Sequence, residues 1–408
     1  MNLVAERFAE QILQSGGDVA SERCGRECSI LIAMRFARYF TFALALHTAA
    51  GQAPKQGTTS NVDSLLSAAI SAQQRHDYKT AIEDYRKILE VQPGLGQARA
   101  NLGSALSADG QFDAAIEEDT KALEVAPDKT AVRMNLGLAY YKKGDVAHAH
   151  DFFEMVHSAR PSDVNAAVLL SYTDIKVDKV AEAATLLGPL EHGHENDMDF
   201  QYVYGYALIE TGKDAEGVPR MERVAQATRS VDAYFIAASA RMQRSQFAEA
   251  RTDTEAALRI DPSFPGLYTL AGQACDALGD TDASAPDFEA ALRANPKDAM
   301  ANLYLGVTRL KQRDFDKARP LLETALELNP GHPLTRLQIA KLDAMTGKND
   351  EAASILEDLE KHDPNWLDPH VELAPIYYKL HRPADGDRER GIVAQIQAKQ
   401  QEAGPHDK

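Results

Sequence analysis

Six residues near the middle of the chain have side chains that could bind a metal ion. They are His148, His150, Glu191, His192, His194 and Glu195. Imidazole nitrogens and carboxylate oxygens are common zinc ligands, but a site also needs fixed geometry and supporting partners. His148 and His150 are two residues apart in a predicted helix and point to different faces, while His192 and His194 flank a glycine in an acidic loop. We therefore predict no metal site and no cofactor.

Sequence motifs for catalysis are also missing. The chain has no G-x-S-x-G, no His-Glu-x-x-His and no glycine-rich loop that would hold a phosphate. Acidic pairs are frequent, but on amphipathic helices they usually form the solvated face. We predict a protein that is not an enzyme. An enzyme or a glycan-binding accessory protein, with a site embedded in the helices, is the alternative, and a pocket with perturbed carboxylates near His192 would favour the enzyme.

The elements that would position any functional side chain follow a sequence pattern that repeats about every 34 residues through residues 62–366. Units begin at Val62, Gly96, Thr130, Val164, Met198, Val231, Pro265, Ala299 and Pro333. A small residue opens the second half of each unit: Ala81, Ala115, Ala149, Ala183, Gly217, Ala250, Ser284, Ala318 and Ala352. Because two helices approach closely only where a side chain is small, these positions predict contacts between paired helices.

Four residues after the small residue, each unit has a second recurring position. Apolar side chains occupy it in seven units: Tyr85, Phe153, Leu187, Met221, Phe288, Leu322 and Leu356. Recurrence at the repeat period predicts that they pack in the core. Asp119 and Thr254 occupy the same position and depart from the pattern. Either those two units are looser, or the polar group reaches a neighbour.

Proline ends most of the units. It occurs at Pro93, Pro127, Pro161, Pro262, Pro296, Pro330 and Pro364, where its missing amide hydrogen stops a helix. The fourth and fifth units lack it. There we expect Gly188 and Pro189 to end a helix early, which places an irregular joint near residues 188–197.

The unit from Gly96 to Lys129 shows the pattern most fully. It contains Leu102, Gly103, Leu106, Gly110, Phe112, Ala115, Ala122 and Pro127. This unit resembles a tetratricopeptide repeat (TPR), a hairpin of two helices that stacks on its neighbours. The resemblance implies an all-α, right-handed α-solenoid of about nine to ten hairpins with a C-terminal capping helix. Nine repeats would span residues 62–366.

We expect the C-terminal region to close the stack. Residues 367–403 would form a degenerate tenth repeat and a capping helix with Ile392, Val393 and Ile396 on one face, while its other face stays in water. Residues 404–408 are predicted to be a disordered tail.

The first 51 residues are predicted to be a leader, followed by a linker at 52–61. Within the leader, residues 34–51 place Arg35 and Arg38 before an apolar run and then small residues, which is the order of a secretory signal. Met34 could be the true start. From this segment we predict an exported protein, periplasmic or secreted, and a bacterial source. A cytoplasmic protein, or one anchored by an uncleaved N-terminal helix, is the alternative.

Charge limits the classes of partner. The net charge is −17, and it lies in the repeats and the tail because the leader is balanced. Nucleic acids and anionic bilayers attract basic surfaces. We therefore predict no nucleic-acid partner and, after removal of the signal, no stable membrane insertion.

The family resemblance implies a function as a protein-binding scaffold or adaptor. In known TPR proteins the first helices line a concave groove that holds a peptide or a partner helix. The matching positions here are Asn101, Met134, Asn135, Leu138, Tyr141, Tyr202, Tyr206, Phe235, Gln273, Met300, Leu303, Tyr304 and Gln338. Asparagine could bond a ligand backbone and the aromatic rings could anchor it. Alternatively, several of these residues belong to the core between repeats.

One specialised TPR site is excluded by the sequence. A carboxylate clamp needs lysine and arginine on the helices that flank a central asparagine. Around Asn101 the corresponding positions are Leu66, Ile70, Ala131 and Asn135. They carry no positive charge, so a peptide carboxylate would have no partner there.

Overall fold

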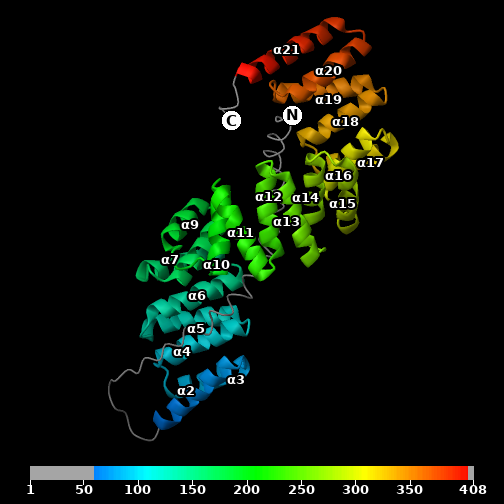
Figure 1. The fold of residues 1–408 in the computed structure, drawn as a ribbon. Coiled ribbons are helices and arrows are strands. Elements are labelled where there is room, and N and C mark those ends of the chain that lie inside the picture. The colour runs from blue at the N-terminus through cyan, green and yellow to red at the C-terminus, as the bar shows by residue number, and fades with distance from the viewer. Residues whose placement is uncertain (1–58, 403–408) are drawn as a thin grey trace. The chain divides into compact units, whose positions relative to one another are not determined.

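The computed structural model describes residues 59–402, and every regular element in that part is a helix. The predicted leader 1–51, most of the linker and the tail 404–408 lie outside the described residues. The described part of the chain forms two compact units, unit 1 ending at Gln243 and unit 2 beginning at Arg244, and each is described by itself. In both units helices adjacent in sequence pack against one another (Figure 1). This confirms the predicted fold class, an all-α helical repeat solenoid.

Unit 1 contains six first helices, five second helices and one short 3-10 helix among its described residues. Their bounds are α2 (Thr59–Gln74), α3 (Tyr78–Val91), α4 (Gly96–Ala108), α5 (Phe112–Val125), α6 (Lys129–Lys143), α7 (Val146–Ala159), α8 (Val164–Lys176), α9 (Val180–Leu187), η2 (Gly188–Leu190), α10 (Met198–Glu210), α11 (Asp214–Thr228) and α12 (Val231–Gln243). Even-numbered α-helices are the first helices of the hairpins.

Unit 2 continues the same alternation. Its helices are α13 (Phe247–Ile260), α14 (Leu267–Ala277), α15 (Thr281–Ala294), α16 (Ala299–Lys311), α17 (Phe315–Leu328), α18 (Pro333–Met345), α19 (Asn349–His362), α20 (Leu367–Lys379) and α21 (Pro383–Glu402). No helix of the described residues in either unit is long and apolar enough to cross a membrane.

Many of these helices begin at an aspartate. The carboxylate accepts a backbone N–H of the first turn at Asp77, Asp128, Asp145, Asp163, Asp197, Asp280, Asp298 and Asp314. Such a cap satisfies donors that have no partner within the helix and contributes about 1 kcal/mol. The acidic composition of the chain thus comes partly from the residues that start its helices.

A residue with positive φ lies between the two helices of every hairpin. Five of these residues are glycines and five are not: Gly110, Gly144, Gly212, Gly279 and Gly347, and His76, Asp178, Ser245, Arg313 and His381. The left-handed conformation ends the first helix and turns the chain into the second. Its recurrence at His381 shows that α20 and α21 are connected like the regular repeats.

The core follows the two recurring positions of the sequence. All nine small residues at the first position are buried, as a close contact between helices requires. The second position is 0% exposed in all nine units, including Asp119 and Thr254. Glycines of the first helices face it: a Cβ added to Gly137 or Gly272 would come within 2.5 or 2.6 Å of a phenylalanine ring. The close approach therefore requires a small residue on one helix and a large one on the other.

Two segments depart from the regular hairpin. The helix α9 ends at Leu187 after only 8 residues, and Gly188–Leu190 forms the 3-10 helix η2. Glu191 then accepts from Nε of Arg220 at 3.1 Å, which ties this joint to α11. At the C-terminus, the capping helix α21 begins at Pro383, because proline is favoured in a first helical turn. Ile396 of its predicted apolar face is buried.

Candidate binding surface

The thirteen residues implied by the family resemblance all lie on first helices. Six of them are buried: Leu138, Tyr202, Gln273, Leu303, Tyr304 and Gln338. The other seven are half-buried: Asn101, Met134, Asn135, Tyr141, Tyr206, Phe235 and Met300. A ligand cannot reach side chains that are already enclosed by neighbouring helices. The six buried residues therefore belong to the core, the alternative that the sequence left open.

Tyr202 and Tyr304 show why burial removes a residue from the surface. The hydroxyl of Tyr202 on α10 donates to Asp232 Oδ2 on α12 at 2.8 Å. Tyr304 on α16 stacks on Phe288, with ring centroids 5.5 Å apart and planes within 10° of parallel. Burial raises the pKa of the Tyr304 hydroxyl. Both rings hold helices together rather than offering a contact to a partner.

The two asparagines also have partners within the protein. Asn135 Nδ2 donates to the carbonyl oxygen of Ala100 at 3.4 Å, a contact between α6 and α4. Asn101 lies close enough to the buried hydroxyl of Tyr85 to lower its pKa, although burial raises that pKa more. These contacts connect neighbouring repeats, so the predicted bonds to a ligand backbone would have to replace or share them.

Four half-buried residues of unit 1 remain as candidates for binding, and we call them the first-helix surface: Met134 and Tyr141 on α6, Tyr206 on α10 and Phe235 on α12. Tyr141 packs edge to face with Tyr172 on α8, with centroids 5.6 Å apart, and its hydroxyl donates to that of Tyr172 at 3.1 Å. Tyr141 and Tyr206 also lie against the largest apolar cluster of this unit. One side of these rings is thus held while another part stays accessible.

Sequence comparison identifies the repeats. A family model described as tetratricopeptide repeat matches residues 66–124, 101–164 and 269–333. A second model with the same description matches residues 309–374. Together they cover just over half of the 408 residues. The chain belongs to the tetratricopeptide repeat family.

Solved structures with similar folds include other TPR proteins. A tetratricopeptide repeat protein from Parabacteroides merdae is 17% identical, with a TM-score of 0.44 over 61% of this chain and 99% of that chain. A chain of the APC/C hetero-tetramer Cut9-Hcn1 is 13% identical, with a TM-score of 0.43 over 83% and 88%. Yeast Tom70 is 15% identical, with a TM-score of 0.36 over 85% and 98%. Likenesses of this degree carry no argument about function. No curated protein matches the sequence.

The predicted metal candidates do not converge in this TPR protein. His192 is fully exposed and lies 3.6 Å from Glu195, whereas His148 bonds to Asp145 at 2.7 Å on the surface of α7. His150 is buried and bonds to Asp174 of α8, and His194 stacks against Phe200. Each histidine thus has its own local partner.

A different group was missed by the sequence analysis. Glu360, His370 and Glu389 come from α19, α20 and α21, and their ligand atoms lie within 4.8 Å of one another. The residues share no short motif, because three separate helices bring them together. The only signal in the sequence was the presence of a histidine, His370, and a glutamate, Glu389, at positions that become buried when the capping helix packs.

An open cleft lies beside the irregular joint of the repeats. It has a volume of about 680 Å³ and is lined by His157, Pro161, Ala181, Glu182, Thr185, Leu186, Pro189 and Leu190. His192 is not among these residues, and Glu182 is the one carboxylate among them. The observation that would have favoured an enzyme, perturbed carboxylates converging in a pocket near His192, is therefore not met at this cleft.

Proposed function

We propose that this TPR protein is a noncatalytic scaffold that binds an extended peptide or a partner helix along its first helices. The observation that carries the proposal is the first-helix surface of unit 1. Its three aromatic rings and one methionine recur on α6, α10 and α12 and are neither enclosed nor fully exposed. Large apolar side chains that are partly held by the core are typical anchors of protein interfaces.

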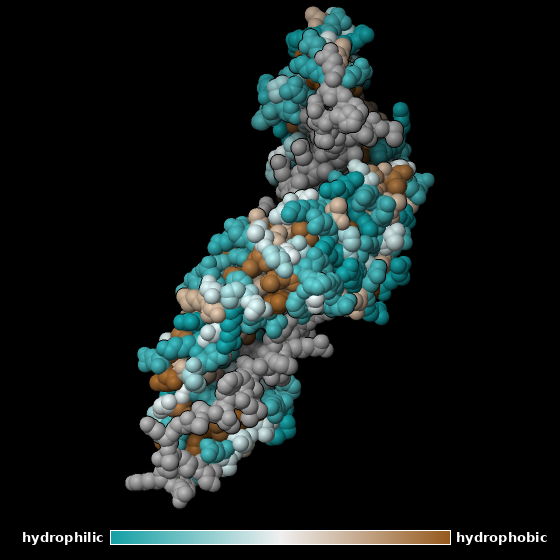
Figure 2. All heavy atoms as spheres, turned by 60° about the vertical axis from the view of Figure 1, so that its left-hand side comes forward, coloured by the Kyte–Doolittle hydropathy of each residue, from teal (hydrophilic) through white to brown (hydrophobic). Residues whose placement is uncertain are grey.

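The physical argument is pre-organisation. Tyr141 is fixed by its contact with Tyr172, and Tyr206 lies against the apolar cluster of α8, α10 and α11. A ring that is already held loses little conformational entropy when a partner covers its remaining surface. On the face that Figure 2 shows, hydrophobic patches are separated by a mainly hydrophilic surface. Such scattered residues need no functional explanation.

The experiment compares matched variants of unit 1 in the full chain. The double variant Tyr206→Ala and Phe235→Ala removes two rings of the first-helix surface. The control, Val91→Ser and Met155→Ser, alters two exposed residues on the second helices α3 and α7. Each immobilised protein is exposed to an extract, and the captured proteins are quantified by mass spectrometry after circular dichroism has verified the fold.

We expect wild type and control to capture the same specific proteins and the ring variant to lose them by at least about tenfold, the effect of 1.4 kcal/mol. Interface anchors commonly contribute more than this. If the ring variant captures every protein that the control captures, the first-helix surface is not the binding site. Tyr202→Ala and Tyr304→Ala would be poor probes, because both rings are buried and their loss would disturb the fold.

A further inference from the structure

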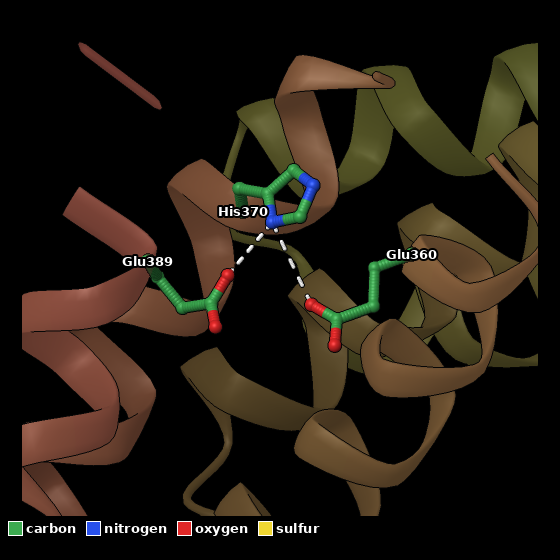
Figure 3. A group of neighbouring side chains, drawn as sticks. All are labelled: Glu360, His370 and Glu389. Carbon is green, nitrogen blue, oxygen red and sulfur yellow. Dashed lines mark hydrogen bonds and ion pairs between the residues drawn. The ribbon is translucent and has the colours of Figure 1, made fainter. Parts of the chain in front are cut away.

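Three helices at the C-terminal end bring together one imidazole and two carboxylates. Figure 3 shows Glu360 from the last turn of α19, His370 from the first turn of α20 and Glu389 from α21 converging on one point. His370 Nδ1 lies 2.7 Å from Oε2 of Glu389 and 3.5 Å from Oε2 of Glu360. The same nitrogen therefore faces both carboxylates.

The donor atoms suit a zinc ion in type and spacing. Zinc binds imidazole nitrogen and carboxylate oxygen at about 2.0–2.2 Å, which separates ligand atoms of a tetrahedron by roughly 3.3–3.6 Å. The 3.5 Å between His370 and Glu360 already fits this range. The distance between His370 and Glu389 is a hydrogen-bond length and would have to increase by a little over half an ångström, roughly, for an ion to enter.

The ligand atoms are supported by further contacts, as metal ligands usually are. The other ring nitrogen of His370, Nε2, lies 3.1 Å from the carbonyl oxygen of Pro364. An N–H at Nε2 donates to that oxygen and leaves the lone pair of Nδ1 directed at the two carboxylates. Arg388 donates to Oε1 of Glu389 at 3.1 and 3.2 Å, so Oε2 remains available to an ion.

The carboxylate of Glu360 supplies the second, independent observation. Its Oε2 is buried and accepts no hydrogen bond, which is costly for a carboxylate unless a cation lies nearby. Burial first, and then the charge of Glu389, raise the pKa of Glu360. The side chains of His370 and Glu389 are only 4% and 1% exposed, but that of Glu360 is 22% exposed. An ion would enter past Glu360.

We propose that Glu360, His370 and Glu389 bind a divalent transition-metal ion, and that this ion is zinc. The ion joins the capping helix α21 to the last repeat. Water supplies the fourth ligand. The ion neutralises two carboxylates that share one imidazole and holds three helices at one point. This role is structural, and it does not depend on the proposed binding along the first helices.

The competing occupant is a proton. If Nδ1 carries a hydrogen, His370 is an imidazolium that donates to Glu389 and to Pro364, and the group is an ion pair without a metal. The metal-bound state and the ion pair therefore differ in whether an ion is present and in whether Nδ1 of His370 carries a hydrogen. Metal binding displaces the hydrogen from Nδ1, whereas the ion pair requires it.

The experiment uses the full chain without an affinity tag, stripped with a chelator and titrated with Zn²⁺ alone by calorimetry. Co²⁺ replaces Zn²⁺ in a parallel titration, because its visible absorption reports the coordination. Glu360→Gln removes one ligand from a partly exposed position and leaves the buried Glu389 with both of its partners, His370 and Arg388. The control Asp174→Asn alters the buried pair of His150 in unit 1. There Lys179, rather than a second carboxylate, faces the ring nitrogen that bonds to Asp174, and the exposed Asp151 lies 3.7 Å from the other ring nitrogen.

We expect one Zn²⁺ per wild-type chain, slower hydrogen exchange in α19 to α21 on addition of zinc, and no change of exchange in α7 and α8. Glu360→Gln should weaken binding by at least about tenfold, while Asp174→Asn should leave it unchanged. Equal binding by wild type and Glu360→Gln would overturn the proposal, since the metal would then be elsewhere. Nitrogen-15 spectra that show hydrogen on both ring nitrogens of His370 in the presence of zinc would also overturn it.

Discussion

Two buried histidines, one in each unit, form the same pair with a carboxylate but differ in the third group beside it. His150 Nε2 lies 2.9 Å from Asp174 in unit 1, and His370 Nδ1 lies 2.7 Å from Glu389 in unit 2. In the first case the third group at that same nitrogen is Lys179, with Nζ 3.4 Å from Nε2, while the exposed Asp151 lies 3.7 Å from the other ring nitrogen. In the second case it is the carboxylate of Glu360.

The difference teaches that the third group decides what a buried pair can bind. Burial raises the pKa of Asp174, while the hydrogen bond from His150 and the charge of Lys179 oppose that rise. Lys179 thus supplies positive charge beside this pair, which makes it less suited to a metal ion. Around His370 two carboxylates share one imidazole, so the site has room for additional positive charge. The same fold supplies both arrangements because each lies where adjacent helices meet.

The largest effect should follow from His370→Leu. With chelator present, this change leaves Glu389 buried beside Glu360 with only Arg388 as a cation. Removing one partner of a buried pair costs about 3–5 kcal/mol. We expect the opening free energy of α20 and α21, measured by native-state hydrogen exchange, to fall by that amount. Hydrogen exchange of individual helices is the suitable measurement, because repeat proteins can unfold locally, one region at a time.

A double variant, His370→Leu with Glu389→Leu, provides the control for this prediction. It removes the unpaired charge as well as the imidazole, so most of the lost stability should return. A fall of less than about 1 kcal/mol in the single variant, the level of an exposed ion pair, would show that the pair around His370 is not an important contact.

A smaller effect is expected from the equivalent change in unit 1, His150→Leu. Asp174 stays buried, but Lys179 remains close enough to lower its pKa. We expect a loss of about 1–3 kcal/mol, the cost of a buried group that loses one hydrogen bond. Hydrogen exchange of α7 and α8 measures it. Adding Lys179→Ala should enlarge the loss, and a loss as large as that of His370→Leu would refute the distinction between the two pairs.

The fold could be predicted from the sequence because its contacts repeat. Ala81 and its eight equivalents mark where paired helices touch, and all nine are buried. A contact that occurs once per unit appears as a period in the sequence. Even the irregular positions, such as the glycine and proline at 188 and 189, are visible as interruptions of that period.

The candidate sites were harder to predict because they depend on how far each helix is rotated about its own axis, which decides the side chains that are buried. Tyr202 and Tyr206 are one helical turn apart on α10, yet Tyr202 is buried and Tyr206 is half-buried. The sequence placed both on the same surface. Glu360, His370 and Glu389 come from three helices, and the capping helix has no repeat period to align it. Only coordinates place Glu389 beside His370.

The smallest expected effect concerns a buried carboxyl group with neither a histidine nor a lysine beside it. Asp119 on α5 is 0% exposed, and neither of its oxygens accepts a hydrogen bond of normal geometry. Its carboxylate lies against Gly103, where a Cβ would come within 2.2 Å. Burial raises its pKa well above the ordinary value, although Asn135 lies close enough to oppose the rise.

Asp119→Leu should therefore stabilise unit 1 by about 1 kcal/mol near neutral pH, the low end for burying an unpaired polar group. Leucine fits because Leu322 occupies the equivalent position against Gly306. Since the folded pKa is raised, the folded wild type keeps its proton after the unfolded chain has lost it. Wild-type stability thus falls as pH rises from about 3.8 through the folded pKa. The advantage of leucine should grow over the same interval, as measured by hydrogen exchange of α4 and α5.

Thr254→Leu is the matched control for this prediction. Thr254 occupies the same position in unit 2, is equally buried, and donates to the carbonyl oxygen of Arg251 at 2.8 Å. Threonine does not titrate, so any effect of this change should be the same from pH 5 to pH 8. If Asp119→Leu also shows no dependence on pH, the carboxyl group is not held neutral by its burial. The distinction between paired and unpaired buried carboxylates would then be supported only by the His370→Leu and His150→Leu variants.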